Sequence, residues 1–136
     1  MKLLLTHVPL ARRQYYGARA LARLHELVEV RLHEGSAPLD PKGLIAAAGG
    51  VDLIIADRAT AVPAEVFNAL PALKVVMRSA IDIRNIDQAA ASKAGVLVTH
   101  AEAGFVKSVV ELTVGDRKST RLNSSHSQQS RMPSSA

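Results

Sequence analysis

The stretch LKVVMRSAIDIRNIDQAAASKAGVLVTHAEAGFVKSVVELTVG, residues 73–115, decides the fold. Its β-branched run at residues 73–77 has the length and composition of a buried strand, and a polar turn follows it. Asn85 is predicted to cap an alanine-rich helix, and Gly95 is placed to end that helix. The apolar run at residues 96–99 then predicts a second strand, so the stretch encodes a strand–helix–strand unit.

A further amphipathic helix is predicted over residues 105–114, after a turn of small residues. Apolar side chains recur there at helical spacing, while Lys107, Ser108 and Glu111 face away from them. The apolar stripe consists of Val106, Val109, Val110 and Val114, with Thr113 on the same side.

These features occur in an order that resembles a known family. The sequence supplies Arg78 at a strand end, Asn85-Ile86-Asp87 at a helix start, Gly95 before a Val-rich strand, Gly104, and Val110-Glu111. In this order it is similar to the N-terminal, substrate-binding domain of the D-isomer-specific 2-hydroxyacid dehydrogenases, which include phosphoglycerate dehydrogenase. The resemblance implies an oxidoreductase that transfers a hydride between NAD or NADP and C2 of a small 2-hydroxy or 2-oxo acid. It also implies a two-domain, homodimeric full-length enzyme.

The residues before this stretch continue the alternation of strands and helices. Strands are predicted at residues 2–7, 28–32 and 51–56, and helices at residues 12–27, 44–48 and 64–70. In the helix at 12–27, the apolar residues Ala18, Leu21, Leu24 and Leu27 are expected to face inward, and Arg12, Arg19 and Arg23 to face solvent. Short strands separated by helices favour right-handed crossovers. The predicted fold is therefore α/β and flavodoxin-like, a parallel sheet with helices on both faces.

Composition limits the location and the partners. The 136 residues contain no cysteine, and the apolar run after Met1 is too short for a secretory leader or a membrane span, so a cytoplasmic protein is expected. The net charge of +5 invites a nucleic-acid partner. However, residues 116–136 hold four of the 17 basic residues and one of the 12 acidic ones, so the excess without them falls to two. With 3% aromatic residues the chain has no stacking platform, and we expect no nucleic-acid or membrane partner.

The sequence changes character after residue 115. Residues 116–136 are rich in serine, have no hydrophobic period and are predicted to be disordered. Their first part is what a common sequencing-adapter string encodes in frame, and residues 130–136 match another adapter segment. We interpret residues 1–115 as an incomplete substrate-binding domain and residues 116–136 as translated adapter; the alternative is a natural basic tail.

Two loops at the predicted carboxyl ends of strands match loops that hold substrate in the family. The first, where relatives often carry Arg-Ser-Ala-Thr, reads Asp57-Arg58-Ala59-Thr60 here, and the second, where relatives usually carry Gly-Val-Gly, reads Ala80-Ile81-Asp82. Glycines let the backbone N–H groups approach a carboxylate closely, and an Asp beside an anion is unfavourable unless it points away. The resemblance implies substrate contacts by Ala59, Thr60, Ala80, Ile81 and Asp82. A turn that merely joins strand to helix is the alternative for the second loop.

The resemblance places the catalytic Arg, Glu and His of the family outside this sequence, so no catalytic residue is assigned. Val106 stands where many relatives have a Thr near the cofactor, and is the expected cofactor-side contact. With no G-x-G-x-x-G, this chain is expected to bind no nicotinamide cofactor and to be inactive alone. The histidines have no metal-ligand spacing, so no metal is expected. The alternative function is a self-contained flavodoxin-like binding or regulatory module without catalysis.

Overall fold

The computed structural model describes residues 1–102, which form one compact unit. The helix predicted over residues 105–114, the cofactor-side Val106 and the serine-rich residues 116–136 lie outside the described residues. The elements in chain order are β1 (Lys2–Leu5), α1 (Pro9–Tyr15), α2 (Ala18–Leu27), β2 (Glu29–Leu32), α3 (Pro41–Ala47), β3 (Leu53–Ala56), α4 (Ala64–Ala69), β4 (Val75–Arg78), α5 (Gln88–Lys93) and β5 (Leu97–His100).

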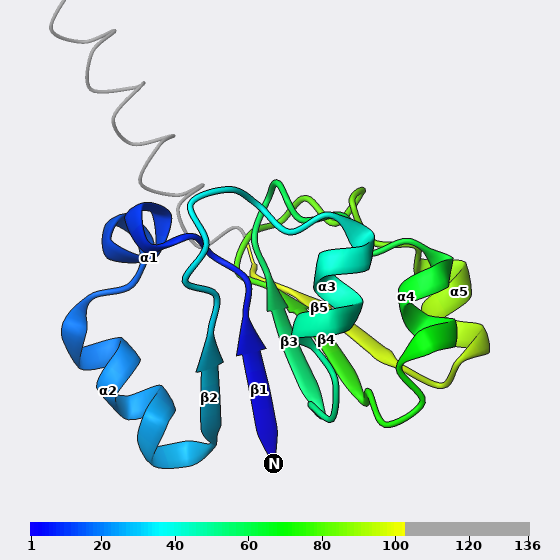
Figure 1. Cartoon of the computed structure of the whole chain (residues 1–136), viewed down its shortest axis with the longest axis horizontal. Coiled ribbons are helices and arrows are strands. Elements are labelled where there is room, and N and C mark those ends of the chain that lie inside the picture. Colours follow the sequence, from blue (N-terminus) through cyan, green and yellow to red (C-terminus); the bar gives the residue numbers. More distant parts are fainter. Residues whose placement is uncertain (103–136) are drawn as a thin grey trace, which may run out of the picture. The chain divides into compact units, whose positions relative to one another are not determined.

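The strands form a single parallel sheet in the order β2-β1-β3-β4-β5 (Figure 1). This is the flavodoxin-like order, so the predicted fold class is confirmed. The register places Leu4, Ile54, Val76 and Val98 side by side on four neighbouring strands. Such a row gives each helix that packs on this face a continuous apolar surface.

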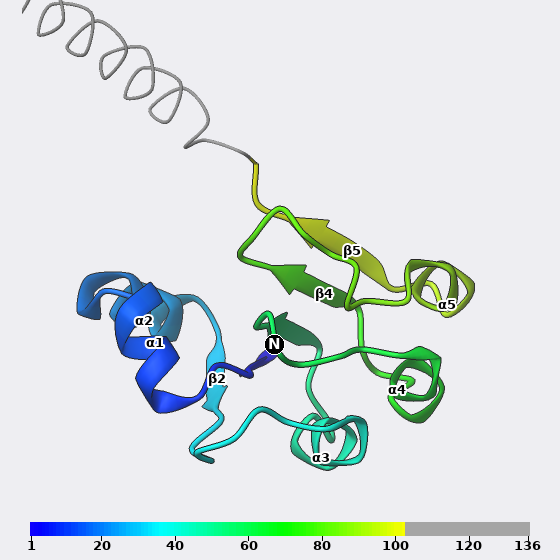
Figure 2. The ribbon, with the colours of Figure 1, turned by 90° about the horizontal axis from the view of Figure 1, so that it is seen from above.

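The helices are divided between the two faces of the sheet. Figure 2 shows α1 and α2 on one side and α3, α4 and α5 on the other. The main core lies under α3, α4 and α5, where Leu44, Val66 and Ala91 from these three helices pack with the buried strand residues. The division follows from right-handed crossovers, because only the β1–β2 connection runs in the opposite direction across the sheet.

The face that carries α1 and α2 is covered unevenly within residues 1–102. Leu3 on β1 is paired through the sheet register with residues that end at Leu97 on β5. Leu3 is 1% exposed, whereas Leu97 is 60% exposed and Met77 on β4 is 38% exposed. The described helices therefore bury this face beside β1 and leave it open beside β5.

Local chemistry sets the helix ends. Asp40 caps α3 by accepting a hydrogen bond from the backbone of Gly43, and Asp87 caps α5 in the same way from Ala90. Gly95 follows α5 with a φ of 72°, the left-handed conformation that glycine adopts without strain. The prediction for Gly95 is therefore confirmed, but Asn85 is not the cap, because Asp87 lies where its carboxylate reaches the first free N–H groups.

The helix predicted over residues 12–27 is wrong as a single element. It is two helices, α1 and α2, and Gly17 is the N-cap of the second. Pro9 lies at the first turn of α1, where its missing N–H costs nothing. Of the residues expected to face inward, Leu21 and Leu24 are half-buried, whereas Ala18 and Leu27 are exposed. Helix α2 thus lies at the edge of the sheet rather than over its centre.

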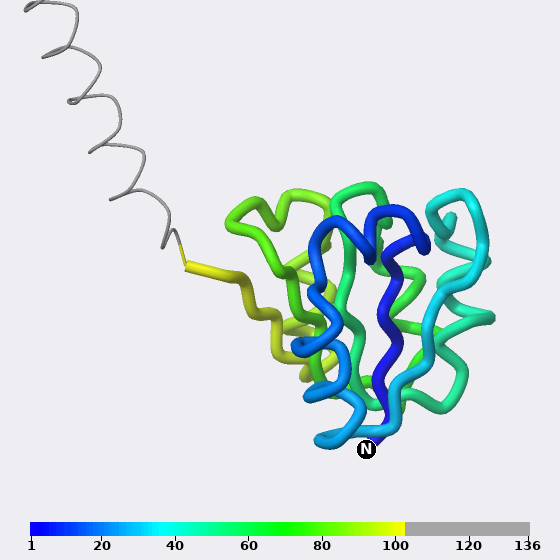
Figure 3. The backbone as a smooth tube through the Cα atoms, turned by 90° about the vertical axis from the view of Figure 1, so that its left-hand side faces the viewer, coloured from blue at the N-terminus to red at the C-terminus, as the bar shows by residue number. Residues whose placement is uncertain are grey.

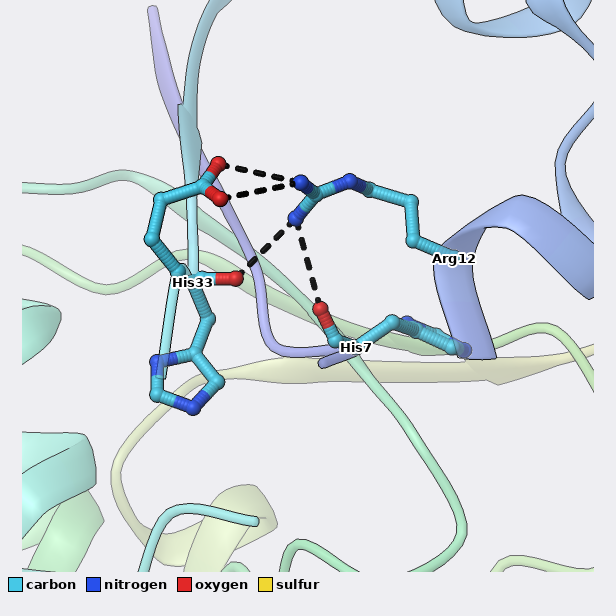
Figure 4. A network of polar contacts seen from close by, with 4 residues as sticks. His7, Arg12 and His33 are labelled. Carbon is cyan, nitrogen blue, oxygen red and sulfur yellow. Dashed lines mark hydrogen bonds and ion pairs between the residues drawn. The ribbon is translucent and has the colours of Figure 1, made fainter. Parts of the chain in front are cut away.

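Arg12 was expected to face solvent and does not. Its guanidinium donates to the carbonyl of His33 at 3.0 Å and lies 3.5 Å from the carbonyl of His7 (Figure 4). It also pairs with the carboxylate of Glu34 at 3.0 and 3.2 Å. Arg12 therefore fastens α1 to the chain that leaves β1 and β2.

Candidate functional site

The carboxyl ends of the parallel strands lie at one end of the sheet, which we call its carboxyl edge. The N-terminus marks the opposite edge in Figure 3, and the loops that follow β1, β3 and β4 come together at the end away from it. The strand order reverses between β1 and β3, because β1 leads to β2 on one side and β3 continues to the other. In parallel α/β sheets ligands bind at such a switch point, so a ligand is expected at this end of the sheet.

A cavity of about 440 Å³ opens at this switch point, between α1 and the loops after β1, β3 and β4. This size is within the range of small-molecule sites. We call it the α1 cavity; its lining residues are His7, Ala11, Tyr15, Tyr16, Asp57, Arg58, Ala59, Arg78, Ser79 and Ala80.

Asp57 organises the loop after β3. Its carboxylate accepts hydrogen bonds from the hydroxyl of Thr6 at 3.2 Å and from the backbone N–H of Thr60 at 2.9 Å. Its own backbone N–H donates to the Thr6 hydroxyl at 2.9 Å. Because Asp57 and Thr60 are both buried, these bonds hold the loop in one conformation against β1.

The loops after β3 and β4 are joined to each other. The side-chain amide of Asn85 donates to the carbonyls of Asp57 and Thr60 at 3.2 and 2.7 Å. Beside it, Val62 and Ile86 form an isolated parallel bridge, and both are buried in the core. The two loops that the sequence singled out therefore form one rigid unit.

Asp82 does not oppose an anion at this edge. Its carboxylate accepts two hydrogen bonds from the guanidinium of Arg84, at 2.9 and 2.8 Å, and one from the backbone N–H of Arg84 at 3.0 Å. The side-chain hydrogen bonds from Arg84 hold the pKa of the Asp82 carboxyl far below its ordinary value. This pair neutralises the charge that made Asp82 an unfavourable replacement for glycine.

Arg78 is the unusual residue of the site. Its side chain is buried, 6% exposed, yet its Nε has no hydrogen-bond partner among residues 1–102, and one Nη lies at 3.5 Å from the carbonyl of Ala56. Neither Arg78 nor Arg58 has a carboxylate partner among residues 1–102. A buried guanidinium without a counter-charge is costly, and it is the feature that sequence reasoning treated only as the end of a strand.

His7 and Tyr16 form the wall of the cavity beside α1. Burial lowers the pKa of the His7 imidazole below its ordinary value of 6.5, with Arg78 and Arg12 acting in the same direction and Asp57 against it. Burial raises the pKa of the Tyr16 phenol, which shares a hydrogen bond with the hydroxyl of Ser79 at 3.0 Å. The two rings meet edge to face at 5.1 Å. At neutral pH this wall presents a neutral imidazole and a neutral phenol.

The predicted substrate residues are only partly brought together. Ala59 and Ala80 line the α1 cavity, whereas Thr60, the residue after Ala59, is fully buried and does not line it. Ile81 is 42% exposed and, like Asp82, does not line the cavity. The sequence analysis did not predict His7, Tyr16 or Arg58 as cavity residues. For Arg58 the available signal was the family pattern Arg-Ser-Ala-Thr, whose Arg stands one residue earlier than Arg58 does here.

In residues 1–102 no three His, Cys, Asp or Glu side chains gather in a group that could hold a metal ion. No helix in that range is long and apolar enough to cross a membrane.

Sequence comparison defines the class of protein. The family described as "D-isomer specific 2-hydroxyacid dehydrogenase, catalytic domain" matches residues 5–136. The chain belongs to this family of oxidoreductases.

Individual relatives agree with that assignment. The chain is 38% identical over 91 residues to D-3-phosphoglycerate dehydrogenase of Mycobacterium leprae, covering 67% of this chain and 17% of the relative. It is 33% identical over 82 residues to glyoxylate reductase of Korarchaeum cryptofilum, covering 60% and 25%. The NAD⁺-bound structure of 3-phosphoglycerate dehydrogenase from Entamoeba histolytica superposes with a TM-score of 0.63 at 20% identity, over 85% of this chain and 37% of that one, and supports the fold. The match thus spans about a sixth of the length of the mycobacterial relative.

Proposed function

We propose that this chain is the substrate-binding part of a D-2-hydroxyacid dehydrogenase that transfers a hydride between NAD or NADP and C2 of a 2-hydroxy or 2-oxo acid. The observation that carries the proposal is the joining of the loops after β3 and β4 by Asn85, in a chain that belongs to this family. These loops end at the switch point of the sheet, where ligands bind in parallel α/β folds.

The substrate contacts in this proposal are made by Ala59, Thr60, Ala80, Ile81 and Asp82. Residues 80–82 contain no glycine and adopt no left-handed conformation. Their N–H groups can therefore approach the acid only if their side chains are short or point away from it. Ala80 has only a methyl group to accommodate, and the Asp82 carboxylate is held by Arg84. The hydrogen bonds between Arg84 and Asp82 thus offset the negative charge that would otherwise repel an acid at this loop.

The nicotinamide cofactor supplies or accepts the hydride when it is bound. The described residues do not fit it, because they contain no strand–turn–helix with the glycines that a dinucleotide pyrophosphate requires. In the full-length enzyme we assign Val106 to the cofactor side. We also propose that the full-length enzyme is a homodimer in the cytoplasm. The 136-residue chain alone should show no turnover.

Calorimetric titration with D-lactate tests the site, and Ala80→Asp is the informative variant. A carboxylate at residue 80 repels the acid and blocks its approach to the backbone, so binding should be lost. Ala72→Asp is the matched control, since Ala72 is exposed in the turn before β4 at the opposite edge of the sheet. Equal binding of D-lactate by the native chain and Ala80→Asp would contradict the proposal. Calorimetry with NADH and an absorbance assay with 2-oxo acids test the expected inactivity, which reproducible turnover would refute.

A further inference from the structure

The sheet ends at β5 in an edge strand that carries no charge. Among residues 1–102, β5 has β4 as its neighbour on one side and no strand on the other (Figure 2). The edge strand at the other end of the sheet, β2, contains Glu29 and Arg31, and such charged side chains keep an edge strand from pairing with another chain. Strand β5 has the sequence Leu-Val-Thr-His, with no Lys, Arg, Asp or Glu between Lys93 and Glu102. An uncharged edge strand of this kind can accept a further strand.

The backbone groups on the free side of β5 belong to Val98 and His100. The N–H groups of Leu97 and Ala101 donate, at 2.9 and 3.1 Å, to carbonyls of the segment that contains β4. Because the backbone groups of successive residues point to opposite sides of a strand, those of Val98 and His100 point away from β4. They are therefore placed to pair with a strand outside the described sheet.

The side chains of β5 add apolar surface beside this free side. Val98 packs against the main core, so Leu97 and Thr99 lie on the other face of the sheet, the face that α1 and α2 leave open. Leu97 is 60% exposed, and Met77, which is paired with Thr99 through the sheet register, is 38% exposed. A strand added to β5 would extend the sheet past these side chains and cover part of them.

The charges at the two ends of β5 favour a second copy of the same chain. Lys93 precedes the strand and Glu102 follows it, both are exposed, and neither has an ion-pair partner among residues 1–102. In an antiparallel pair of identical strands the start of one lies beside the end of the other, so Lys93 of each copy comes close to Glu102 of the other. Parallel pairing would place like charges together instead.

We propose that two copies of this chain associate through β5, antiparallel and around a two-fold axis, so that their sheets join into one. In the register that uses all the free groups of the strand, Val98 of each copy exchanges hydrogen bonds with His100 of the other. Thr99 then lies on the axis and faces Thr99 of the second copy, while Leu97 lies opposite Ala101. The inference does not depend on the substrate or the reaction proposed above, and its failure would leave both unchanged.

A single introduced cysteine tests the register, because the native chain contains none. Residues that face each other in a non-hydrogen-bonded antiparallel pair have Cα atoms about 4.5 Å apart, a separation that a disulfide can bridge. Thr99→Cys should therefore form a cross-linked dimer under mild oxidation, detected by non-reducing gel electrophoresis. Leu97→Cys is the matched control, on the same face and more exposed. The two copies of residue 97 would lie about 13 Å apart, too far for a disulfide.

Sedimentation equilibrium of the 136-residue chain measures the association without a cross-link. A strand of four residues makes a small interface, so we expect a dimer with a Kd between about 1 μM and 1 mM. His100→Pro removes an N–H that points away from β4 and leaves the hydrogen bonds between β4 and β5 in place, and it should be monomeric in this range. His100→Ala keeps the N–H and is the control, expected to dimerise like the native chain.

Three results would overturn the inference. A native chain that stays monomeric up to about 1 mM does not associate in this way. Equal cross-linking of Thr99→Cys and Leu97→Cys rejects a two-fold axis at Thr99. A dimer that is as stable in His100→Pro as in His100→Ala uses a different surface. If His100→Pro does not fold, the two cysteine variants decide.

Discussion

The side-chain amide of Asn85 donates a hydrogen bond to the main-chain carbonyl of Thr60 at 2.7 Å, across 25 residues of sequence. A second hydrogen bond from the same amide reaches the carbonyl of Asp57. One side chain thus fixes the distance between the two loops that the proposed function requires.

Replacing Asn85 by Ala should therefore destabilise the fold. Two part-buried carbonyls would lose their donor, and we expect a loss of about 1–3 kcal/mol in the free energy of unfolding. Urea denaturation measures it, and Asn68→Ala on the exposed side of α4 is the control, expected to change stability by less than about 0.5 kcal/mol. A value for Asn85→Ala as small as that of the control would mean that the two loops are held by the backbone bridge alone.

Arg12 provides a second test of how the site is supported. Arg12→Gln removes the charged donor to the carbonyl of His33, and should cost about 1.5 kcal/mol or more. Arg13→Gln is the matched control, because Arg13 is exposed on the same helix. Equal thermal midpoints for the two variants would show that α1 does not depend on this contact.

The titration of His7 should make stability depend on pH. Because its pKa in the folded chain lies below 6.5, the unfolded chain binds the proton first as the pH falls. The contribution of neutral His7 to the stability of the fold is fully present above pH 6.5 and is lost as the pH falls toward the pKa that His7 has in the folded chain. Burial is the main cause, and the groups facing the ring are Asp57, Arg78, Arg12 and the phenols of Tyr15 and Tyr16.

Urea denaturation of the native chain and of His7→Gln checks this dependence between about pH 5 and pH 8, the range in which histidines ordinarily titrate. The native chain should lose more stability below pH 6.5 than His7→Gln does. Parallel curves for the two proteins would show that His7 is not the group responsible.

The pKa of Asp82 should rise when the guanidinium of Arg84 is removed. In the native chain the hydrogen bonds from the Arg84 side chain and backbone keep this pKa far below its ordinary value, and in Arg84→Gln the carboxyl carbon signal should titrate at a clearly higher pH, because only the backbone N–H of residue 84 still donates to the carboxylate. The same variant should bind D-lactate more weakly, because a free carboxylate then faces the acid. An unchanged titration of Asp82 in Arg84→Gln would show that the pair does not persist in solution.

Sequence patterns predicted the features of the fold that depend on residues close to one another in the chain. The five strands, the left-handed Gly95 and the flavodoxin-like class follow from apolar runs and turn residues, and all agree with the structure. The break at Gly17 was missed because the apolar spacing of α1 and α2 nearly continues across it.

The parts of the site that depend on distant residues could not be predicted in this way. Asn85 reads as a helix cap, since nothing local reveals that its amide reaches Asp57 and Thr60. Arg78 was interpreted from the sequence as the end of a strand, and only the fold shows that it is buried with no ion-pair partner among residues 1–102. Asp82 reads as an obstacle to an acid until its pairing with Arg84 is seen.

The central claim is that the loops after β3 and β4 hold the 2-hydroxy acid, and backbone amide NMR spectra of the chain with and without D-lactate test it most directly. We predict saturable shifts confined to the amides of residues 57–60 and 79–82, at the carboxyl edge of the sheet. Shifts at the amino ends of the strands, shifts over the face covered by α3, α4 and α5, or no saturable shift at all, would contradict the claim.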